Sequence, residues 1–577
     1  MKTKSKKILL FSLPYIVIFF VITILLNYQL INHATIITSD AWVHFNRFYD
    51  SSMQLKTGNL SYFQTNYGFN HSGRIFNALY GPLFAYLNGL LLLICKNWFT
   101  FQIVIDYIVM MIAGIGMYYL GRKVKVNQVI ALLLATIYLQ FGITVGILRF
   151  NWMSWGAAIA PFVMIQAVNM IEDKAKPIHW LILAILMSTL AQIHLLSTVI
   201  LAVTLIPFFI YCVVISKNKK QIFIDLGKAL LLTLLLTANI WGAFLLLYPT
   251  NMISLPRIFD LNESALHVSR FISLHEYISY SILALIIFQV IYIAFNFKKS
   301  KINTISTIVA LVFLVVSSRI FPWTFIQQIF PKLGASFQFP YRLMVGAYPL
   351  LLMSVGISLN QLVKKYHEVA KYYTIFALML ILLHNFSFNL TSIYRNTNNF
   401  IDEEQVVEMN NYCMITVDKE DIKSSARYSN DGKLFELVSH VEPDYLPVKK
   451  HHVSNSYYLR GVMKQNYKYH YQVDGNKLIL TWSSKDSKNI YLPVVMYHQS
   501  RLIVNGNNVS DCHKNVINQP LIKTKKGLNK ATLQFITPIW FKILLVITII
   551  SWLALAGYGI KRLIDLKDKK KFNEQNE

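Results

Sequence analysis

Asp40, His44 and Arg47 lie close together in the stretch 38–47, directly after the first apolar segment of the chain. On a helix, Asp40 and His44 would share one face because they are four residues apart, and Arg47 would lie one turn further along. A carboxylate, an imidazole and a guanidinium are suited to proton transfer and to phosphate recognition. The motif is short, so the same residues also suit the solvated face of an amphipathic interfacial helix.

Further polar residues stand at the ends of apolar segments: Arg149, His194, Arg319, Gln338 and Arg342. Arginines on the outer side of a membrane need a reason to be there. Binding of a phosphate group through two guanidinium nitrogen atoms would supply one. Each residue also has a plain alternative. Arg149 lies beside tryptophans and would anchor an interface, His194 would cap a tight turn, and Arg342 would extend towards water from a helix start.

The composition indicates a polytopic membrane protein. Of the 577 residues, 55% are hydrophobic, and the mean hydropathy is +0.43. Repeated apolar runs of about 17–25 residues match the length of helices that cross a ~30 Å hydrocarbon core. The net charge of +27 comes from short lysine clusters between these runs. That distribution is typical of cytoplasmic loops and argues against a nucleic-acid partner.

We therefore predict an all-α fold with about twelve transmembrane helices and both termini in the cytoplasm. The apolar segment 80–95 would reverse the alternation of the basic clusters if it crossed, so we expect an interfacial or re-entrant helix within a first external loop at 27–100. The expected crossings are at about 8–26, 101–120, 128–147, 155–171, 178–193, 199–216, 226–247, 278–296, 303–318, 341–360, 373–390 and 538–558.

The character of the chain changes after residue 390. Alternating runs at 467–473 and 477–482 flank Asp474-Gly475, and runs at 491–496 and 501–504 precede Asn505-Gly506. These are strand and hairpin signals. We expect a transmembrane domain at 1–390, an extracytoplasmic β-rich domain at 391–537, and a final helix with a basic cytoplasmic tail at 538–577. Cys413 and Cys512 fall in the external domain and could pair, although their spacing shows neither a zinc site nor a disulfide framework.

Several short motifs carry a resemblance to a known family. The segment 337–342 (Phe-Gln-Phe-Pro-Tyr-Arg) resembles the QFPWR stretch of large bacterial membrane proteins called "6-pyruvoyl-tetrahydropterin synthase-related", which overlap the YfhO-type family. Tyr341 stands where tryptophan is commoner. The segments 39–47, 192–197, 444–447 and 491–506 also look like that family. The name implies no pterin chemistry, because the zinc-binding histidine cluster of a pterin synthase is not visible here.

The resemblance implies a GT-C-like architecture in the bacterial cell membrane. Such enzymes transfer a sugar from a polyprenyl-phosphate donor to an acceptor on the outer face, and an essential acid in their first external loop corresponds to Asp40. The leading hypothesis is a glycosyltransferase that uses an undecaprenyl-phosphate-linked sugar and modifies a cell-wall glycopolymer or glycolipid. Asp40 would be the base and His44 its assistant, with a divalent cation (Mg²⁺ or Mn²⁺) as an open alternative at these two residues. Donor phosphate or substrate would be bound by Arg47, Arg149, His194, Arg319, Gln338 and Arg342.

The alternative is a non-enzymatic membrane protein that exports or assembles an envelope polysaccharide or teichoic acid. A protein that moves a polymer across the bilayer should place ionisable residues along a path through the membrane. Here the candidate residues are expected on one side, which favours the enzyme.

Overall fold

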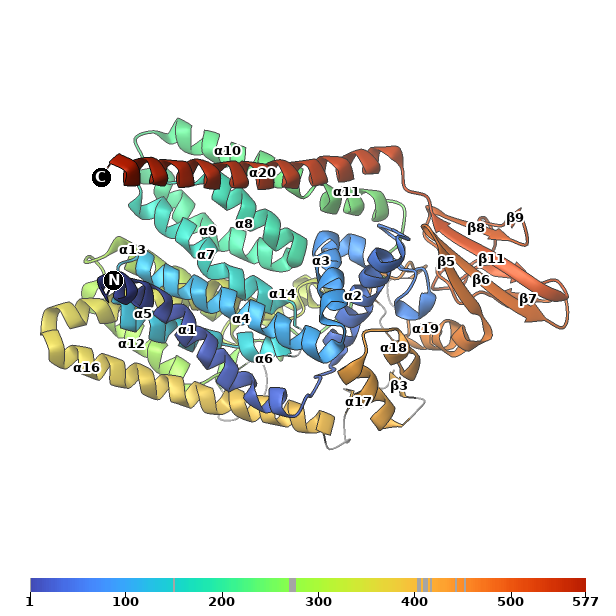
Figure 1. Cartoon of the computed structure of the whole chain (residues 1–577), viewed down its shortest axis with the longest axis horizontal. Coiled ribbons are helices and arrows are strands. Elements are labelled where there is room, and N and C mark those ends of the chain that lie inside the picture. Colours follow the sequence, from blue (N-terminus) through green and yellow to red (C-terminus); the bar gives the residue numbers. More distant parts are fainter. Residues whose placement is uncertain are drawn as a thin grey trace.

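The computed structural model describes residues 2–148, 151–268, 277–401, 406–407, 413–415, 418–441, 444–450 and 453–576. The described chain is mostly helical, with a sheet region near the C-terminus (Figure 1). Both termini and the bend of helix α16 lie at one end of the molecule, and the strands of the large sheet lie at the other.

The N-terminal part folds into α1 (Lys2–Ile31), α2 (Ser39–Thr57), α3 (Pro82–Cys95), α4 (Trp98–Lys123), α5 (Gln128–Leu139), α6 (Ile143–Leu148) and α7 (Met153–Glu172), with 3-10 turns η1 (Phe69–His71) and η2 (Asn77–Leu79). Helix α2 begins at an N-cap, where the Thr38 hydroxyl accepts a hydrogen bond from the Ala41 backbone N–H. It ends at Gly58, whose φ of 75° allows the left-handed C-cap. Local capping signals therefore fix both ends of the helix that carries Asp40, His44 and Arg47.

The central part contains α8 (Trp180–Ile193), α9 (Leu195–Ile215), α10 (Lys219–Leu236), α11 (Ala238–Leu247), β1 (His267–Val268), β2 (Tyr277–Ile278), α12 (Tyr280–Asn296), α13 (Lys301–Ser317), α14 (Trp323–Ile329), α15 (Leu333–Ser336), η3 (Pro340–Leu343) and α16 (Met344–Ile401). Within α16, His367 has non-helical angles (φ 58°, ψ −142°). The element is thus two helices that meet at His367, between the predicted crossings at 341–360 and 373–390.

Among the residues described, six helices are long and apolar enough to cross a membrane, or seven if the bent pair α10 and α11 forms one span; this count takes Pro340–Ile401 as one helix despite its bend at His367. The prediction of twelve crossings is therefore not confirmed. Several apolar runs are divided into shorter helices: the run at 128–147 breaks after Leu139, and Gly142 has a φ of 80° before α6 starts. Helix α8, which lies within the predicted crossing at 178–193, has 14 residues. Such a helix rises only about 21 Å, less than a ~30 Å core.

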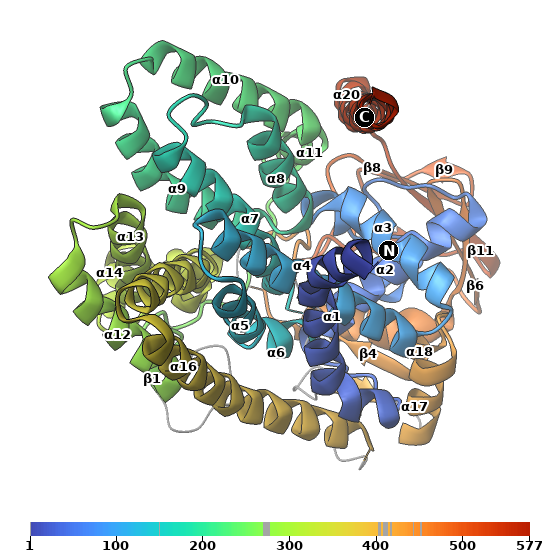
Figure 2. The ribbon, with the colours of Figure 1, turned by 60° about the vertical axis from the view of Figure 1, so that its left-hand side comes forward.

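The last helix, α20 (Ile539–Asn576), packs on the bent pair. Helices α10 and α11 meet at an angle of 63° at Thr237. The Thr548 hydroxyl accepts from the Asn239 N–H at 2.9 Å, and Trp552 Nε1 donates to the Leu236 carbonyl at 3.0 Å. The Asn239 N–H and the Leu236 carbonyl lie at the break between the two helices, and α20 supplies their hydrogen-bond partners. In an apolar environment, backbone polar groups at a break need such partners. Figure 2 shows α20 beside α10 and α11.

The C-terminal region is helical before it becomes a sheet. It contains β3 (Cys413–Ile415), α17 (Lys419–Tyr428), α18 (Lys433–Leu437), β4 (Val438–His440), α19 (Ser456–Gly461), η4 (Met463–Lys468), β5 (His470–Asp474), β6 (Lys477–Ser484), β7 (Asn489–Tyr491), β8 (Ser500–Val504), β9 (Asn507–Asn508), β10 (Leu521–Lys523) and β11 (Gly527–Phe535). Helix α16 also continues beyond residue 390, to Ile401. Most of the β structure of the predicted 391–537 domain thus lies in 470–535.

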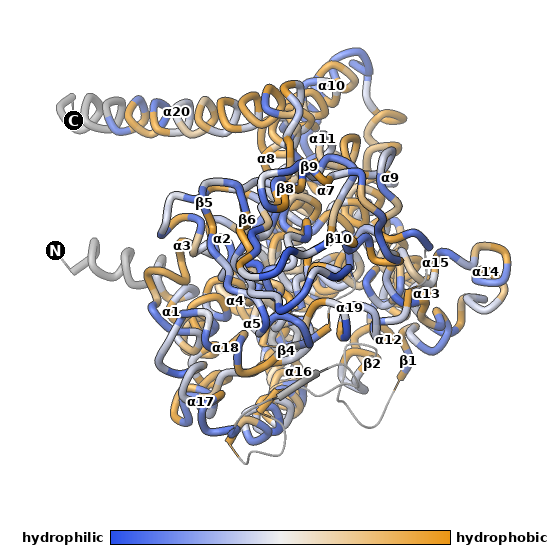
Figure 3. The backbone as a smooth tube through the Cα atoms, turned by 90° about the vertical axis from the view of Figure 1, so that its right-hand side faces the viewer, coloured by the Kyte–Doolittle hydropathy of each residue, from blue (hydrophilic) through white to orange (hydrophobic). Residues whose placement is uncertain are grey.

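The large sheet has the order β5-β6-β11-β8-β9 and is antiparallel. Two predicted turns are confirmed, since Asp474 pairs with Lys477 and Val504 with Asn507. The run at 491–496 does not form a hairpin with 501–504, because β7 pairs with β10. Figure 3 shows the strands as less hydrophobic than helices such as α20. The five-stranded sheet and the β7–β10 pair share one hydrophobic core and together form a small sandwich. This core includes Leu480, Leu492, Val494, Leu502, Ile522 and Leu533.

Candidate functional site

A cavity of about 710 Å³ lies where α2, the start of α3, the α8–α9 junction, α11, the α15–η3 segment and residues 444–445 meet. These elements come from widely separated parts of the chain, and residues 151–152 before α7 also contribute to the wall. Five of the predicted site residues line this cavity: Asp40, His44, His194, Gln338 and Arg342.

Asp40 lies in the first turn of α2, two residues after the capping Thr38. Asp40 is exposed and lines the cavity. The neighbouring residue Ser39 also contributes to the cavity wall. The N-terminus of a helix favours a negative charge because its backbone N–H groups point outward there. Asp40 is therefore a solvent-accessible carboxylate on a rigid element.

His44 lies one turn further along α2 and is buried, with its ring stacked on Trp152 at a centroid distance of 4.4 Å. Its Nδ1 lies 3.0 Å from Arg47 Nη1. A guanidinium only donates, so His44 Nδ1 accepts this hydrogen bond and the ring proton resides on Nε2. Burial and the Arg47 charge hold the pKa of His44 well below its usual range. His44 is a neutral hydrogen-bond donor, and its accepting nitrogen is already used.

Arg47 is fully buried behind the cavity wall and does not line it. Its guanidinium donates to the Asn77 side-chain oxygen at 3.0 Å and to the Tyr80 carbonyl. The aromatic ring of Tyr80 also lies below its charge, at 4.7 Å. Burial lowers the pKa of Arg47 to about 10, so it stays charged at neutral pH. Arg47 joins α2 to the 77–80 turn; the structure does not bring it to the cavity as a donor-phosphate ligand.

The long first loop is anchored to the same helix. Asp50 is buried on α2, and its Oδ1 accepts hydrogen bonds from the Asn66 and Tyr67 backbone N–H groups at 2.8 Å each. Burial raises the pKa of Asp50 to about 6, although these hydrogen bonds oppose the rise. Asp50 thus holds the loop that leads to the cavity.

His194 ends α8 and caps α9. Its Nδ1 accepts a hydrogen bond from the Ser197 backbone N–H at 3.3 Å and lies 2.8 Å from the Ser197 hydroxyl. A protonated imidazolium could not accept the N–H, so the proton of His194 also resides on Nε2. His194 caps a helix, as the plain alternative predicts, and it also lines the cavity.

Arg342 reaches the cavity from η3. Its Nη1 donates to the Phe337 carbonyl and its Nη2 to the Gln338 Oε1, each at 3.0 Å, and its charge lies 4.8 Å from the Phe339 ring centre. A guanidinium has five N–H donors, so these two contacts orient Arg342 and leave further donors for a ligand. Gln338 holds the arginine from a left-handed backbone conformation, with φ of 63°.

The other two predicted arginines are not part of this arrangement. Arg319 donates to the Glu263 carbonyl at 2.9 Å and does not line the cavity. It lies two residues after the end of α13, where it is bound to the loop that contains Glu263. Arg149 lies outside the residues that the structure describes.

The predictions missed much of the aromatic wall. Tyr80, Trp152 and Tyr248 line the cavity, as does Tyr445, whose ring lies 6.5 Å from that of Tyr80. Burial raises the pKa of Tyr80 to about 12, so its hydroxyl remains protonated. Asp444 adds a second carboxyl to the wall. Residues 444–445 carried only a family resemblance, and nothing in their spacing places them near α2, 400 residues away.

A metal site would need several His, Cys, Asp or Glu residues of the described chain to lie together. Within the described chain, no group of three or more His, Cys, Asp or Glu residues could hold a metal ion. The pair proposed for a divalent cation does not fit either, because His44 presents N–H rather than a lone pair towards any ligand other than Arg47. Cys512 is a free thiol, and the Cys413 side chain lies outside the described residues.

The arrangement is suited to an anionic ligand beside a polar one. Arg342 supplies a cation, while His44 and His194 are neutral N–H donors. Asp40 supplies a carboxylate that can accept a proton or orient a hydroxyl. The walls carry aromatic faces, as in many small-molecule sites.

No family model matches the chain, and no curated protein matches it, so the family resemblance of the sequence motifs is not confirmed. Among solved structures, the chain is similar to the crystal structure of the Archaeoglobus fulgidus oligosaccharyltransferase in the apo form. The likeness has a TM-score of 0.38 at 13% identity and covers 76% of this chain; the chain spans 62% of that protein. A likeness at this level does not establish a common fold or activity.

Proposed function

We propose that the chain is a membrane glycosyltransferase that moves a sugar from a polyprenyl-phosphate donor to a hydroxyl of a cell-envelope glycopolymer or glycolipid. The observation that carries this proposal is the shared cavity of Asp40, His194 and Arg342. A single inverting displacement needs one base for the acceptor and one group that stabilises the leaving phosphate. Arg342 is the candidate for the second role, and the cavity holds two carboxyl groups for the first, of which Asp40 is the more exposed and Asp444 the more buried.

In the proposed reaction, the acceptor oxygen attacks the anomeric carbon and forms the new glycosidic bond. Its proton passes to the Asp40 carboxylate, and the bond between the anomeric carbon and the phosphate oxygen breaks. The polyprenyl phosphate leaves with the electron pair, and Arg342 stabilises its charge. The proton transfer is assigned to Asp40 and the stabilisation of the leaving group to Arg342, and no step is routed through a metal ion.

The neutral histidines act by donation in this mechanism. His44 and His194 each keep a proton on Nε2, since Arg47 and Ser197 donate to their Nδ1 atoms. Such N–H groups stabilise an anion without a change in their own protonation. His44 therefore assists as a donor to substrate and does not take the acceptor proton.

The apolar wall offers a route for the lipid tail. Leu195 and Val199 line the cavity at the start of α9, and their side chains are 42% and 52% exposed. Helix α9 is one of the candidate membrane spans. A polyprenyl chain could therefore extend from the cavity along an exposed apolar helix into the bilayer while its phosphate stays near Arg342.

The test compares envelope glycopolymers and lipid-linked sugars in three strains: wild type, a deletion strain, and one that carries only Asp40→Asn. The enzyme hypothesis expects an unmodified acceptor and accumulated lipid-linked donor in both mutants. An export or assembly protein would instead leave the Asp40→Asn strain with a normal profile, because its task needs no base at Asp40.

A further inference from the structure

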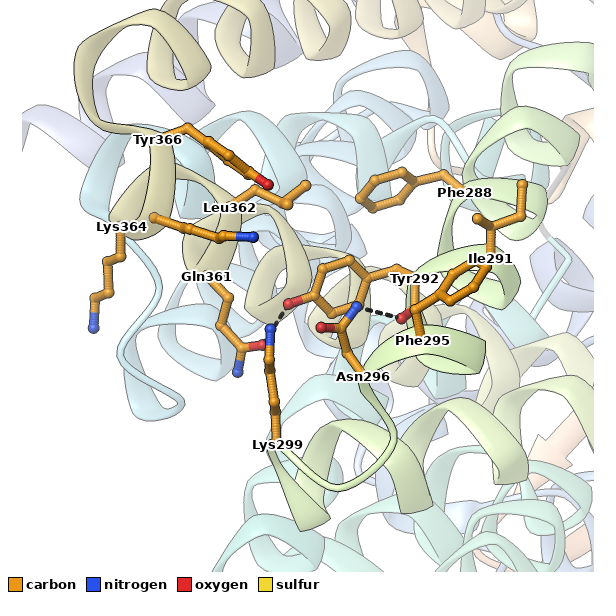
Figure 4. A pocket seen from close by; sticks show the side chains of 11 residues that line it. Phe288, Ile291, Tyr292, Phe295, Asn296, Lys299, Gln361, Leu362, Lys364 and Tyr366 are labelled. Carbon is orange, nitrogen blue, oxygen red and sulfur yellow. Dashed lines mark hydrogen bonds between the residues drawn. The ribbon is translucent and has the colours of Figure 1, made fainter.

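A second cavity lies at the opposite end of the helical part from the sheet. It has a volume of about 670 Å³ and lies between the C-terminal end of α12 and the part of α16 just before the His367 bend (Figure 4). Its lining combines two classes of side chain: the cationic Lys299, Lys364 and Lys365, and apolar groups that include Phe288, Ile291 and Phe295.

The three lysines give this pocket an unbalanced positive charge. All three are exposed, and within the described chain none of them makes an ion pair. The nearby Glu368 instead pairs with Lys371, at 3.1 Å. No Asp or Glu occurs among the described lining residues. Lys365 Nζ also lies 4.7 Å from the Tyr366 ring centre, and Figure 4 shows Lys364 extending away from Lys299, so the ammonium groups border the pocket from different sides. Their summed charge would attract an anion.

The remaining walls are apolar and open. Phe295 is 83% exposed and Ile291 is 54% exposed, although both line the pocket. Between these groups and the lysines, the Tyr292 hydroxyl donates to Gln361 Oε1 at 2.6 Å. Figure 4 shows the tips of Lys299, Gln361 and Tyr292 close together, with Phe288 and Ile291 to one side. The pocket therefore changes from charged to polar to apolar across its width.

This gradient matches the order of groups in a phospholipid. We propose that the pocket binds an anionic phospholipid, with its phosphate at Lys299, Lys364 and Lys365 and its acyl chains against Phe288, Ile291 and Phe295. The site lies at the end of the molecule that carries both lysine-rich termini (Figure 1), where basic clusters of membrane proteins meet anionic headgroups. The proposal is independent of the glycosyltransferase reaction, because none of its residues lines the first cavity.

The test measures retention of phosphatidylglycerol by the purified full-length protein, with native mass spectrometry and a titration of the lipid in detergent. The variant Lys299→Gln/Lys364→Gln/Lys365→Gln should bind phosphatidylglycerol about tenfold more weakly or worse, since each lysine near a headgroup contributes. The matched control is Lys217→Gln/Lys219→Gln/Lys220→Gln. It removes the same charge from an exposed turn that does not line the pocket, and it should bind like the wild type.

Two further arms separate the pocket from general attraction to negative charge. Phosphatidylcholine should bind weakly to both wild type and variant, and glycerol 3-phosphate in excess should not displace the lipid, because it has no acyl chains. Phe295→Ala removes an exposed ring, so the protein should fold and yet bind phosphatidylglycerol less tightly. Equal losses in both triple variants, equal binding of phosphatidylcholine, or displacement by glycerol 3-phosphate would overturn the proposal.

Discussion

Arg47 Nη1 donates a hydrogen bond to His44 Nδ1 across 3.0 Å, one helical turn apart on α2. The contact changes the chemistry expected of His44. A histidine four residues from an aspartate suggests a partner in proton transfer, but a nitrogen that accepts from a guanidinium has no lone pair left for a proton. His44 is therefore a donor in this site, and the role of base passes to a carboxylate, for which we propose the exposed Asp40.

Replacement of Arg47 by lysine should destabilise the protein. An ammonium cannot reach His44, the Asn77 oxygen and the Tyr80 carbonyl together from a fully buried position. We expect a loss of roughly 2–4 kcal/mol, measured as a lower thermal unfolding midpoint in detergent. Arg427→Lys is the control, since Arg427 is only half-buried and donates to the His33 and Asn32 backbone carbonyls, with its charge beside the Phe400 ring. Equal shifts in the two variants would contradict the assigned role.

His44 should make stability depend on pH. Its pKa in the folded protein lies well below its usual value of about 6.5, whereas the unfolded chain takes up the proton. The unfolded state therefore binds more protons below pH ~6.5, and stability falls as the pH drops, by up to about 1.4 kcal/mol per pH unit. His44→Asn keeps an acceptor for Arg47 and removes the titration. Its unfolding midpoint should fall less between pH 7 and 5 than that of the wild type; an identical decline would refute the buried neutral state.

Arg342 should affect binding of the lipid-linked donor. Arg342→Gln removes the cation, and the KM for the donor should rise about tenfold or more, because a hydrogen bond to a charged group contributes 1.5–3 kcal/mol. Gln338→Ala should give a smaller rise, since it removes only the group that orients Arg342. Arg319→Gln serves as the matched control and should leave the KM unchanged. A larger effect at Arg319 than at Arg342 would place the phosphate elsewhere.

Gly81 should not tolerate a side chain. It has a φ of 68°, and a Cβ atom there would lie 2.0 Å from the Gln192 carbonyl oxygen. Gly81→Ala should therefore separate α3 from the α8–α9 junction that carries His194, with a cost of more than about 2 kcal/mol. Gly227→Ala is the control; Gly227 lies within α10 with open space around it. The yield of folded protein in detergent distinguishes the two, and equal yields would argue against the close packing at Gly81.

Periodic and capping signals predicted local structure well. Helix α3 lies within the segment 80–95, the break at His367 lies between two predicted crossings, and the Asp474-Gly475 turn joins β5 to β6. These features depend on neighbours in the sequence. The pairing of β7 with β10 does not, because it joins segments 30 residues apart whose order in the sheet no local pattern specifies.

In the candidate site, too, local features were easier to predict than contacts between distant segments. Residue types at the ends of apolar segments led us to expect Asp40, His194 and Arg342 on one side, and these three residues line one cavity. The partner of His44 and the position of Arg319 depend on side-chain direction and on distant loops, which spacing does not reveal. Tyr80 and Tyr445 were missed because buried aromatic residues are common in any membrane protein, so their type carries no specific signal.

In the proposed reaction, Asp40 takes the proton of the acceptor hydroxyl. The most direct measurement is the rate of sugar transfer by purified Asp40→Asn protein in proteoliposomes, with the lipid-linked sugar and acceptor identified from the strain comparison. Asparagine keeps the size and exposure of this side chain but cannot accept the proton, so the rate should fall by about 10²–10⁴-fold while the unfolding midpoint stays unchanged. Transfer at the wild-type rate by the folded variant would contradict the account.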